Sequence, residues 1–346
     1  MKRIRVVQWG LGAMGSGMVR LMLEKEGLQV VGAIDSRKEY IGKDLGDVVE
    51  AGKKLNIKVV DNPKAVLKKS DVDMVIMATN SFTKEIFDDL HLVVEHGIDC
   101  LTIAEEMAFP EAGEYDLSQS LDVLAKQKKC RVLGTGINPG FVLDSLIIML
   151  SGVCHKVTRV EASRINDLSP FGPTVMRTQG VGSTPEEFKQ GLGQGTIVGH
   201  IGFRESIQMI SEALGLNVDR YEEVREPIIS TVDRETKFIK IKAGMVAGCK
   251  HTGIGYAGNT KVIELVHPQQ IRPELEQVDT GDYINIIGTP ELHLSIKPEI
   301  PGGVGTIGVA VNMIPHLHKS TPGVKRMIDL PIPACLMGET AYSRRV

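Results

Sequence analysis

The stretch Arg5-Val6-Val7-Gln8-Trp9-Gly10-Leu11-Gly12-Ala13-Met14-Gly15 decides the fold of this 346-residue chain. A β-branched pair leads directly into three glycines, and apolar residues at helical spacing follow them. The pattern predicts a strand, a tight turn and a helix. In such a unit the first glycine permits the turn, the second lets the backbone approach a pyrophosphate, and the third lets the helix pack closely on the strand. We therefore expect the loop from Gly10 to Gly15, with Leu11, Gly12, Ala13 and Met14 between them, to bind a dinucleotide.

An acidic residue follows at the spacing that this unit requires. A second apolar run, residues 28–34, ends in Asp35, 20 residues beyond Gly15, where a carboxylate can hold a ribose hydroxyl. Ser36, Arg37 and Lys38 come next, at the place where basic groups would meet a 2′-phosphate. The two signals conflict, so the sequence predicts NAD or NADP as the cofactor. The alternative for Arg37 and Lys38 is that both are simply solvated.

The composition excludes several classes of protein. The formal net charge of −3 gives no basic surface for nucleic acid or for an anionic membrane, and no apolar run approaches the ~20 residues that span a bilayer. The five cysteines are odd in number and scattered, and neither they nor the histidines stand at metal-ligand spacings. These features predict a reduced, cytoplasmic protein without a metal site.

Strand and helix signals alternate up to about residue 140. This alternation predicts the α/β class, with residues 1–140 forming a doubly wound, mostly parallel Rossmann sheet. Thr79 and Asn80 follow the apolar run 72–78, and the carboxyl ends of parallel strands border the ligand crevice. We therefore predict both as cofactor contacts, the alternative being a capping turn before the next helix.

The pattern changes in the second half of the chain. Residues 237–242 and 291–297 alternate apolar with polar side chains, which predicts half-exposed strands of a mostly antiparallel sheet in an α+β domain over residues 141–302. Residues 303–346 are predicted to return to the first domain as a helix, Val304 to Ile314, followed by a proline-rich tail. Asn312 on this helix is expected near the cofactor.

Two adjacent carboxylates, Glu105 and Glu106, follow the strand predicted at residues 100–103. Successive strand residues point to opposite sides, so we expect only one of them to enter the crevice as a catalytic group. The alternative is that one or both cap the next helix. Asn138, Pro139, Gly140 and Phe141 form a similar turn after the following strand and are expected to contact substrate, with Asn138 also near the cofactor.

Four residues at the start of the second domain are candidates for binding a substrate carboxylate. A carboxylate needs an arginine or lysine partner, and hydrogen-bonding side chains can stand beside it. Solvated charge is the alternative for each charged member. The four residues are Arg164, Asn166, Arg177 and Thr178.

Four motifs together resemble the family of 2,4-diaminopentanoate dehydrogenase and the native amine dehydrogenases, over nearly the full length. They are the glycine loop, Ala104-Glu105-Glu106-Met107, residues 136–141 and residues 310–315. The resemblance implies NAD(P)-dependent oxidative deamination, in ornithine degradation, of 2,4-diaminopentanoate to 2-amino-4-oxopentanoate and ammonia. It also implies a catalytic glutamate, here Glu105 or Glu106, and a homodimer. Amine dehydrogenases that act on simple ketones share these motifs.

Two other functions remain as alternatives at this stage. The first is a reductase of the dihydrodipicolinate or homoserine-dehydrogenase type, which would need a lysine or histidine donor that neither the Glu105 loop nor the Asn138 loop supplies. The second is a regulatory protein that senses the dinucleotide without turnover.

Overall fold

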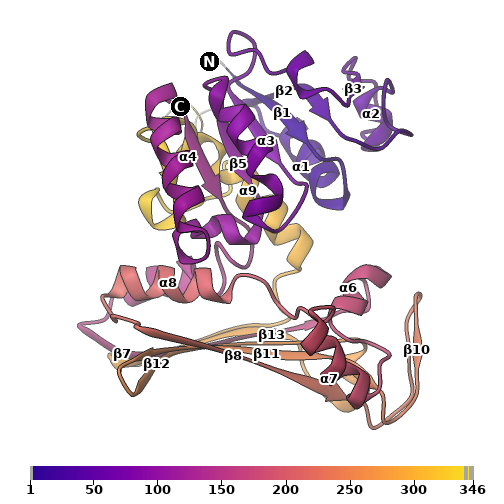
Figure 1. Ribbon diagram of the computed structural model, residues 1–346, viewed down its shortest axis with the longest axis vertical. Helices are drawn as coiled ribbons and strands as arrows, with labels where there is room; N and C mark the ends of the chain where they lie inside the picture. The colour runs from indigo at the N-terminus through magenta and orange to yellow at the C-terminus, as the bar shows by residue number, and fades with distance from the viewer. Residues whose placement is uncertain (1–2, 339–341, 343–346) are drawn as a thin grey trace. The chain divides into compact units, whose positions relative to one another are not determined.

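The computed structural model describes residues 3–338 and 342. The chain forms two compact units, the first made of Met1–Phe141 and Pro301–Val346 and the second of Val142–Ile300 (Figure 1). The chain therefore leaves the first unit once and returns to it near residue 301.

A seven-stranded parallel sheet forms the centre of the first unit, as far as the structure describes it. The strand order is β15-β6-β5-β4-β1-β2-β3, and every neighbouring pair is parallel. The strands are β1 (Ile4–Trp9), β2 (Leu28–Ile34), β3 (Val59–Val60), β4 (Met74–Met77), β5 (Asp99–Thr102), β6 (Arg131–Gly134) and β15 (Gly323–Lys325). Strands β1 to β6 stand in the spatial order of a doubly wound Rossmann sheet, 3-2-1-4-5-6, and β15 is added beside β6. This order confirms the predicted fold class.

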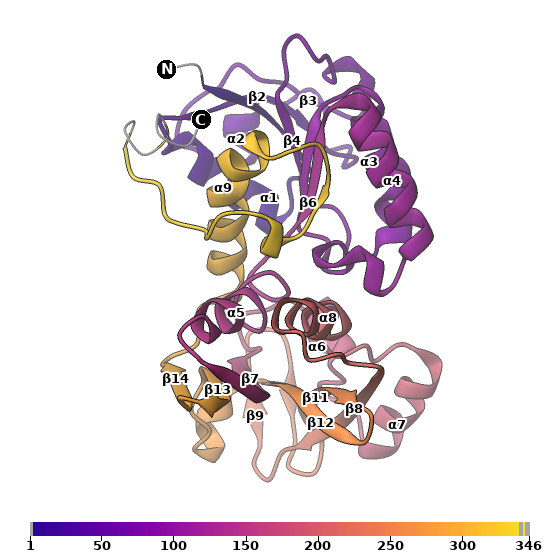
Figure 2. The same ribbon diagram turned by 90° about the vertical axis from the view of Figure 1, so that its left-hand side faces the viewer.

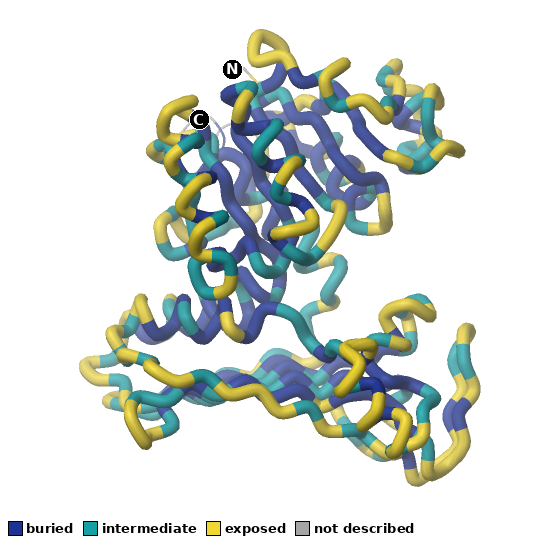
Figure 3. The backbone as a smooth tube through the Cα atoms, in the orientation of Figure 1, coloured by how far each residue is buried: buried dark blue, intermediate teal, exposed yellow. Residues whose placement is uncertain are grey.

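Helices cover both faces of this sheet, which explains why all four residues of β4 and of β5 are buried. Figure 2 shows α1 and α9 on one side and α3 and α4 on the other. The helices are α1 (Ala13–Leu23), α2 (Leu45–Val48), α3 (Thr83–Glu95), α4 (Tyr115–Lys128) and α9 (Gly302–Lys319), with short 3₁₀ turns η1 (Pro63–Ala65), η2 (Glu105–Ala108), η3 (Pro110–Ala112) and η5 (Met327–Asp329). In Figure 3 the central strands are mostly buried, while exposed residues recur along α4.

The returning helix α9 is longer than the sequence predicted, running from residue 302 to 319 rather than from 304 to 314. It packs closely on α1 because a glycine stands at the contact: a Cβ on Gly17 would lie 2.3 Å from the Cδ1 atom of Ile307. Beyond α9 the chain adds β15 to the edge of the sheet beside β6. The sequence predicted only a tail there, so β15 corrects that prediction.

The second unit is built on a six-stranded sheet in the order β14-β13-β7-β12-β11-β8. Its pairs are antiparallel except for β12 with β7, in agreement with the predicted mostly antiparallel sheet. The strands are β7 (Lys156–Asp167), β8 (Arg220–Ile229), β11 (Val246–Ala257), β12 (Thr260–Gln270), β13 (Gly281–Thr289) and β14 (Leu292–Ile296); β9 (Arg234–Glu235) and β10 (Lys240–Ile241) form a separate pair. The strand predicted at 237–242 is thus only β10, outside the main sheet.

One face of the six-stranded sheet is covered by helices. The Phe203 ring of α8 lies against Gly253 of β11, where a Cβ would come within 2.9 Å of the Phe203 Cβ, and α5 contacts β13. Residues of β7 and β12 alternate between buried and half-buried, so their other face is less covered. The helices of this unit are α5 (Ser145–Ser151), α6 (Pro173–Thr178), α7 (Pro185–Gln194) and α8 (Phe203–Leu214), with the 3₁₀ turn η4 (Pro273–Glu276).

No helix among the described residues is both long enough and apolar enough to cross a membrane.

Candidate dinucleotide and catalytic site

The three glycines after β1 differ in what surrounds them. Gly10 has a φ of +87°, and a Cβ there would lie 2.4 Å from the Ala78 carbonyl oxygen. A Cβ on Gly15 would lie 1.9 Å from the carbonyl oxygen of Gly10, so this glycine lets α1 approach the turn. Gly12 is exposed and has no atom within 4 Å of the position of a Cβ. Gly12 therefore leaves open space at the N-terminus of α1, as a bound pyrophosphate requires.

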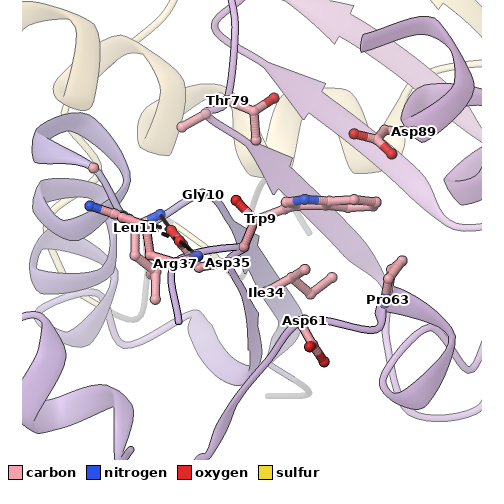
Figure 4. A pocket seen from close by; sticks show the side chains of 13 residues that line it. Trp9, Gly10, Leu11, Ile34, Asp35, Arg37, Asp61, Pro63, Thr79 and Asp89 are labelled. Carbon is pink, nitrogen blue, oxygen red and sulfur yellow. Dashed lines mark hydrogen bonds and ion pairs between the residues drawn. The ribbon is translucent and has the colours of Figure 1, made fainter. Parts of the chain in front are cut away.

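A cavity of about 600 Å³ opens beside this loop (Figure 4). It is bordered by the ends of β1, β2 and β4, by the segment after β3 and by α3. Its lining residues are Trp9, Gly10, Leu11, Gly12, Ile34, Asp35, Ser36, Arg37, Asp61, Pro63, Ala78, Thr79 and Asp89. The cavity lies at the carboxyl edge of the parallel sheet, where ligands bind in doubly wound folds.

Asp35 lies in this cavity and is already surrounded by donors. Its carboxylate accepts hydrogen bonds from the Leu11 amide at 2.7 Å and from the Arg37 amide at 2.9 Å. The Arg37 guanidinium donates through Nε at 2.9 Å and Nη2 at 2.6 Å. Burial opposes ionisation of this carboxyl, but the donors from Arg37 and Leu11 hold its pKa below the usual value. Asp35 is therefore an anion at neutral pH and can accept from a ribose hydroxyl.

Arg37 lines the cavity and is not simply solvated, and its contact with a 2′-phosphate stays a prediction. Its guanidinium pairs with Asp35 and lies 4.1 Å from the centre of the Tyr40 ring. Ser36 and Lys38 are exposed, and of these two only Ser36 lines the cavity.

Thr79 and Asn80 follow β4 as predicted, and both are exposed. Thr79 lines the cavity, whereas Asn80 does not and its Oδ1 atom accepts from the Ser81 amide at 2.6 Å. The Asn80 side chain therefore bonds within the turn before α3 without capping that helix, whose N-cap residue is Phe82, and the cofactor contact of Thr79 stays a prediction.

Glu105 and Glu106 lie in the 3₁₀ turn η2 rather than in an extended strand, because β5 already ends at Thr102. The argument from strand alternation was therefore wrong. The two carboxylates nevertheless differ in surroundings: Glu106 Oε2 accepts a hydrogen bond from the Thr83 amide at 2.8 Å, at the start of α3. Glu106 thus caps α3, which precedes it in the chain, whereas the sequence offered a cap on the following helix as the alternative.

Glu105 is partly buried and forms no ion pair with any described residue. Burial raises the pKa of Glu105 above the usual value for a glutamate, against the opposing effect of a hydrogen bond with Ser81. A carboxyl with a raised pKa holds a proton more readily than an exposed glutamate does. This property suits a group that accepts a proton and later returns it.

The turn at Asn138 follows β6 and lies at the same edge of the sheet. Gly140 has a φ of +126°, and a Cβ there would lie 2.5 Å from the Gly136 amide nitrogen, so only glycine fits. Pro139 and Gly140 are buried, while Asn138 and Phe141 are partly exposed. The loop also contacts α9, since the Ile137 amide donates to the Thr306 hydroxyl at 3.2 Å.

Asn312 is not at this edge. Thr306 contacts the loop after β6, and His318 at the other end of α9 bonds Asp99, the first residue of β5. The helix therefore runs from the carboxyl edge of the sheet to its amino edge, and Asn312 lies about 9 Å along the axis from Thr306. This position does not support the predicted cofactor contact.

A buried polar group lies on the covered face of the second unit. Arg164 and Asn166 stand two residues apart on β7, and both are buried. Arg164 pairs with buried Asp282, and the Asn166 Oδ1 atom lies 2.8 Å from His267 Nε2 on β12. Burial holds the pKa of His267 well below its usual value, so its ring is neutral.

His267 was not singled out from the sequence, although the alternation of Ile263, Leu265 and His267 along β12 could have placed it on the buried face. Its Nδ1 atom is buried without a hydrogen-bond partner in the described part of the chain. Arg177 is exposed and the Thr178 hydroxyl donates to the Val175 carbonyl within α6. The structure thus joins Arg164 and Asn166 with His267, but not with Arg177 or Thr178.

Comparison with known proteins identifies the family. Residues 141–346 match the model of the 2,4-diaminopentanoate dehydrogenase C-terminal domain, and residues 4–101 match that of the dihydrodipicolinate reductase N-terminus. The chain is 43% identical to 2,4-diaminopentanoate dehydrogenase of Acetoanaerobium sticklandii over 342 residues, 98% of this chain and 96% of that protein. The chain belongs to the 2,4-diaminopentanoate dehydrogenase family.

More distant relatives agree with this assignment. The amine dehydrogenase of Streptomyces virginiae is 22% identical over 95% of this chain and 96% of its own length. The structure of amine dehydrogenase from Mycobacterium smegmatis matches with a TM-score of 0.84 at 28% identity, covering 96% of this chain and 97% of that one. The family predicted from the four motifs is confirmed, and with it an enzyme of the dehydrogenase class.

Proposed function

We propose that this chain catalyses NAD(P)-dependent oxidative deamination of 2,4-diaminopentanoate to 2-amino-4-oxopentanoate and ammonia, and the reverse reductive amination. The relative of that name shares 43% of its residues over nearly the whole chain. The observation that carries the chemistry is Glu105, a partly buried carboxyl without an ion-pair partner in the described chain, at the carboxyl edge of the dinucleotide sheet.

The cofactor fits the glycine loop of the first unit. The open space at Gly12 admits a pyrophosphate, and Asp35 and Arg37 offer an acceptor for a ribose hydroxyl and a cation for a 2′-phosphate. When bound, NAD(P) supplies the acceptor for the hydride that leaves the amine carbon. We propose that both NAD and NADP are used.

Glu105 performs the proton transfers. Hydride leaves a C–H bond beside nitrogen only when the nitrogen has a lone pair, and an alkylammonium has none at neutral pH. Glu105 takes that proton, which makes the amine a donor. Water then attacks the iminium carbon, and the carbinolamine loses ammonia as the same carboxyl transfers protons between the oxygen and nitrogen atoms.

The amino-acid end of the substrate requires a cation for its carboxylate. We propose that Arg164, together with Asn166 and His267, binds this end. Arg164 donates to Asp282 and to the Ile300 carbonyl, and a guanidinium has five N–H donors in total, so further donors remain. The buried, unpartnered Nδ1 atom of His267 adds a polar group to the same cluster.

An amine dehydrogenase acting on simple ketones is the second candidate, favoured by the relatives from Streptomyces virginiae and Mycobacterium smegmatis. A dihydrodipicolinate reductase is disfavoured, because that resemblance covers only the first part of the chain, while residues 141–346 match another family's domain. A sensor without turnover is disfavoured because the full-length relatives are named as dehydrogenases.

We further propose a cytoplasmic homodimer that acts in ornithine degradation. The less covered face of the six-stranded sheet, with half-buried Ile165 on β7 and Val266 on β12, supports a self-association surface. Unpaired cysteines support a reducing compartment: the structure describes Cys100, Cys130, Cys154, Cys249 and Cys335, and none of them forms a disulfide.

The deciding experiment mixes the purified protein with NAD⁺ or NADP⁺ and one of two amines, and records the absorbance of the reduced cofactor. The amines are 2,4-diaminopentanoate and a simple alkylamine whose primary amino group stands on a secondary carbon. A rate at least tenfold higher with the diamino acid supports the proposed substrate. Faster turnover of the simple amine favours the second candidate, and no reduction with either amine refutes deamination.

A further inference from the structure

The dinucleotide cavity has a polar end and an apolar end. Asp35 and Arg37 form the polar end, whereas the apolar side chains of Trp9, Ile34 and Pro63 lie at the other, where Asp61 and Asp89 also border the cavity (Figure 4). The Trp9 side chain is 8% exposed and belongs to the core that α3 covers, so its ring is a fixed wall of the cavity. A planar, weakly polar group fits against such a wall.

Asp89 on α3 lines the same cavity as Trp9, on the Trp9 side in the view of Figure 4. It is partly buried, and no hydrogen bond or ion pair to its carboxylate is formed by residues 3–338. Burial and the neighbouring Asp88 raise the pKa of Asp89. Asp35 differs in this respect, since it already accepts from Leu11 and Arg37. Asp89 is thus a partly buried acceptor in this cavity that the described residues leave unused.

We propose that Asp89 recognises the base of the dinucleotide by accepting a hydrogen bond from the 6-amino group of adenine, whose ring lies at the Trp9 end of the cavity. The inference rests on the proposed use of NAD(P). If Asp35 holds the adenosine ribose, the adjoining group of the cofactor is the adenine ring, and the apolar end of the cavity adjoins Asp35.

The chemistry of the base favours a carboxylate here. The 6-amino group is the exocyclic donor of adenine, and an ionised aspartate only accepts. A base with a carbonyl oxygen at position 6 would place an acceptor against Asp89, and a buried acceptor without a donor is unfavourable. With the base in this position, Asp89 would therefore favour adenine over hypoxanthine.

Asp61 is the other carboxylate in this cavity without an ion-pair partner among the described residues, and it is the alternative reader of the base. It follows β3 and is exposed, so water competes for any hydrogen bond that it makes. Asp88 precedes Asp89 on α3 and is exposed outside the cavity. These two residues provide matched controls.

The test compares the Kd values of NAD⁺ and nicotinamide hypoxanthine dinucleotide by calorimetry on the full chain. The wild type is expected to prefer NAD⁺ by roughly ten- to a hundredfold, the usual effect of a hydrogen bond to a charged group. In Asp89→Asn the amide can accept from an amino group or donate to a carbonyl, so the preference should fall to within about threefold. Asp89→Ser should lose it as well, while Asp61→Asn and Asp88→Asn should keep it.

Quenching of Trp9, the single tryptophan of the chain, gives a second readout of the same titrations. Equal affinity of the wild type for both dinucleotides would refute base recognition while leaving the proposed function intact. An unchanged preference in both Asp89 variants, or its loss in Asp61→Asn alone, would likewise overturn the role of Asp89. If neither NAD⁺ nor NADP⁺ binds, the proposed function fails and this inference fails with it.

Discussion

The Arg37 guanidinium forms a bidentate pair with the Asp35 carboxylate, donating from Nε at 2.9 Å to one oxygen and from Nη2 at 2.6 Å to the other. A 2′-phosphate can reach Arg37 fully only if this pair opens, and a free 2′-hydroxyl has to share Asp35 with Arg37. NAD would therefore gain Asp35 as a partner, and NADP would gain Arg37, each by weakening the pair between these two residues. This balance is consistent with use of both cofactors.

We expect the catalytic efficiencies with NAD and NADP to lie within about two orders of magnitude, since one charge-assisted contact is worth roughly 1.5–3 kcal/mol. Asp35→Ala should raise the Kd of NAD⁺ about tenfold or more and that of NADP⁺ much less, because the variant frees Arg37 for the phosphate. Calorimetric titration measures both values, with exposed Lys38→Ala as a control. Strict use of one cofactor by the wild type would refute the prediction.

The sequence predicted the first unit well because its signals are local. The run 28–34 is β2 to the residue, and the glycine spacing predicted the loop that follows β1. β15 could not be predicted, because its three residues are too few to show an alternation of apolar and polar side chains. They form a strand only through pairing with β6. Residues 237–242 alternate like a strand, yet β10 pairs only with β9, a choice that tertiary contacts decide.

In the candidate site, too, local signals could be predicted from the sequence, whereas contacts between distant residues could not. Position along the chain placed Thr79, Glu105 and Asn138 after consecutive strands of the sheet, at one edge. It could not show that Glu106 caps α3 or that Arg37 turns back onto Asp35, since both depend on side-chain contacts across loops. The position of Asn312 along α9 could not be predicted, because the length and direction of that helix were unknown.

The returning helix α9 is expected to be necessary for the stability of the first unit. Leu317 is fully buried, whereas Val304 is 69% exposed on the same helix. Leu317→Ala should lower the free energy of unfolding by about 2–5 kcal/mol, and Val304→Ala should change it by less than ~0.5 kcal/mol. Urea unfolding measures both. A chain that ends before Gly303 should lose cofactor binding; if it binds NAD(P) normally, α9 does not support the site.

The buried pair of Arg164 and Asp282 in the second unit gives a further prediction. Their side chains are 3% and 1% exposed, so Asp282→Asn leaves a buried guanidinium without its counterion. Breaking such a pair costs about 3–5 kcal/mol, which we expect as a lower free energy of unfolding. Asp279→Asn is the control, because Asp279 is 80% exposed in its pair with Lys297. Equal stability of the two variants would contradict the prediction.

The raised pKa of Glu105 predicts how stability depends on pH. A carboxyl whose pKa is higher in the folded than in the unfolded chain binds more protons when folded, so stability is lost as pH rises from the unfolded value, about 4.3, through the folded one. Glu105→Gln removes this loss. We expect the variant to match the wild type in Tm near pH 4 and to exceed it at neutral pH; a Tm difference that is independent of pH would be inconsistent with this.

The two glutamates supply the sharpest test of the mechanism, because the structure assigns them different partners. Glu105→Gln keeps size and hydrogen bonding but removes the base, which should lower deamination turnover by roughly 10²–10⁴. Glu106→Gln keeps an oxygen that can accept from the Thr83 amide, so α3 should retain its cap and turnover should change little. NAD(P) affinity should stay nearly unchanged in both.

The same pair of variants separates catalysis from folding. Turnover of the wild type should rise with pH through an inflection above the usual glutamate pKa, as Glu105 loses its proton, and that inflection should vanish in Glu105→Gln. Turnover and its pH profile are measured beside cofactor affinity for all three proteins. If both variants turn over like the wild type, neither glutamate is the base and the proposed deamination lacks its proton acceptor, even though the fold and family stand. If turnover falls only in Glu106→Gln, then Glu106 is the catalytic base as well as the cap at Thr83, and Glu105 is not the base.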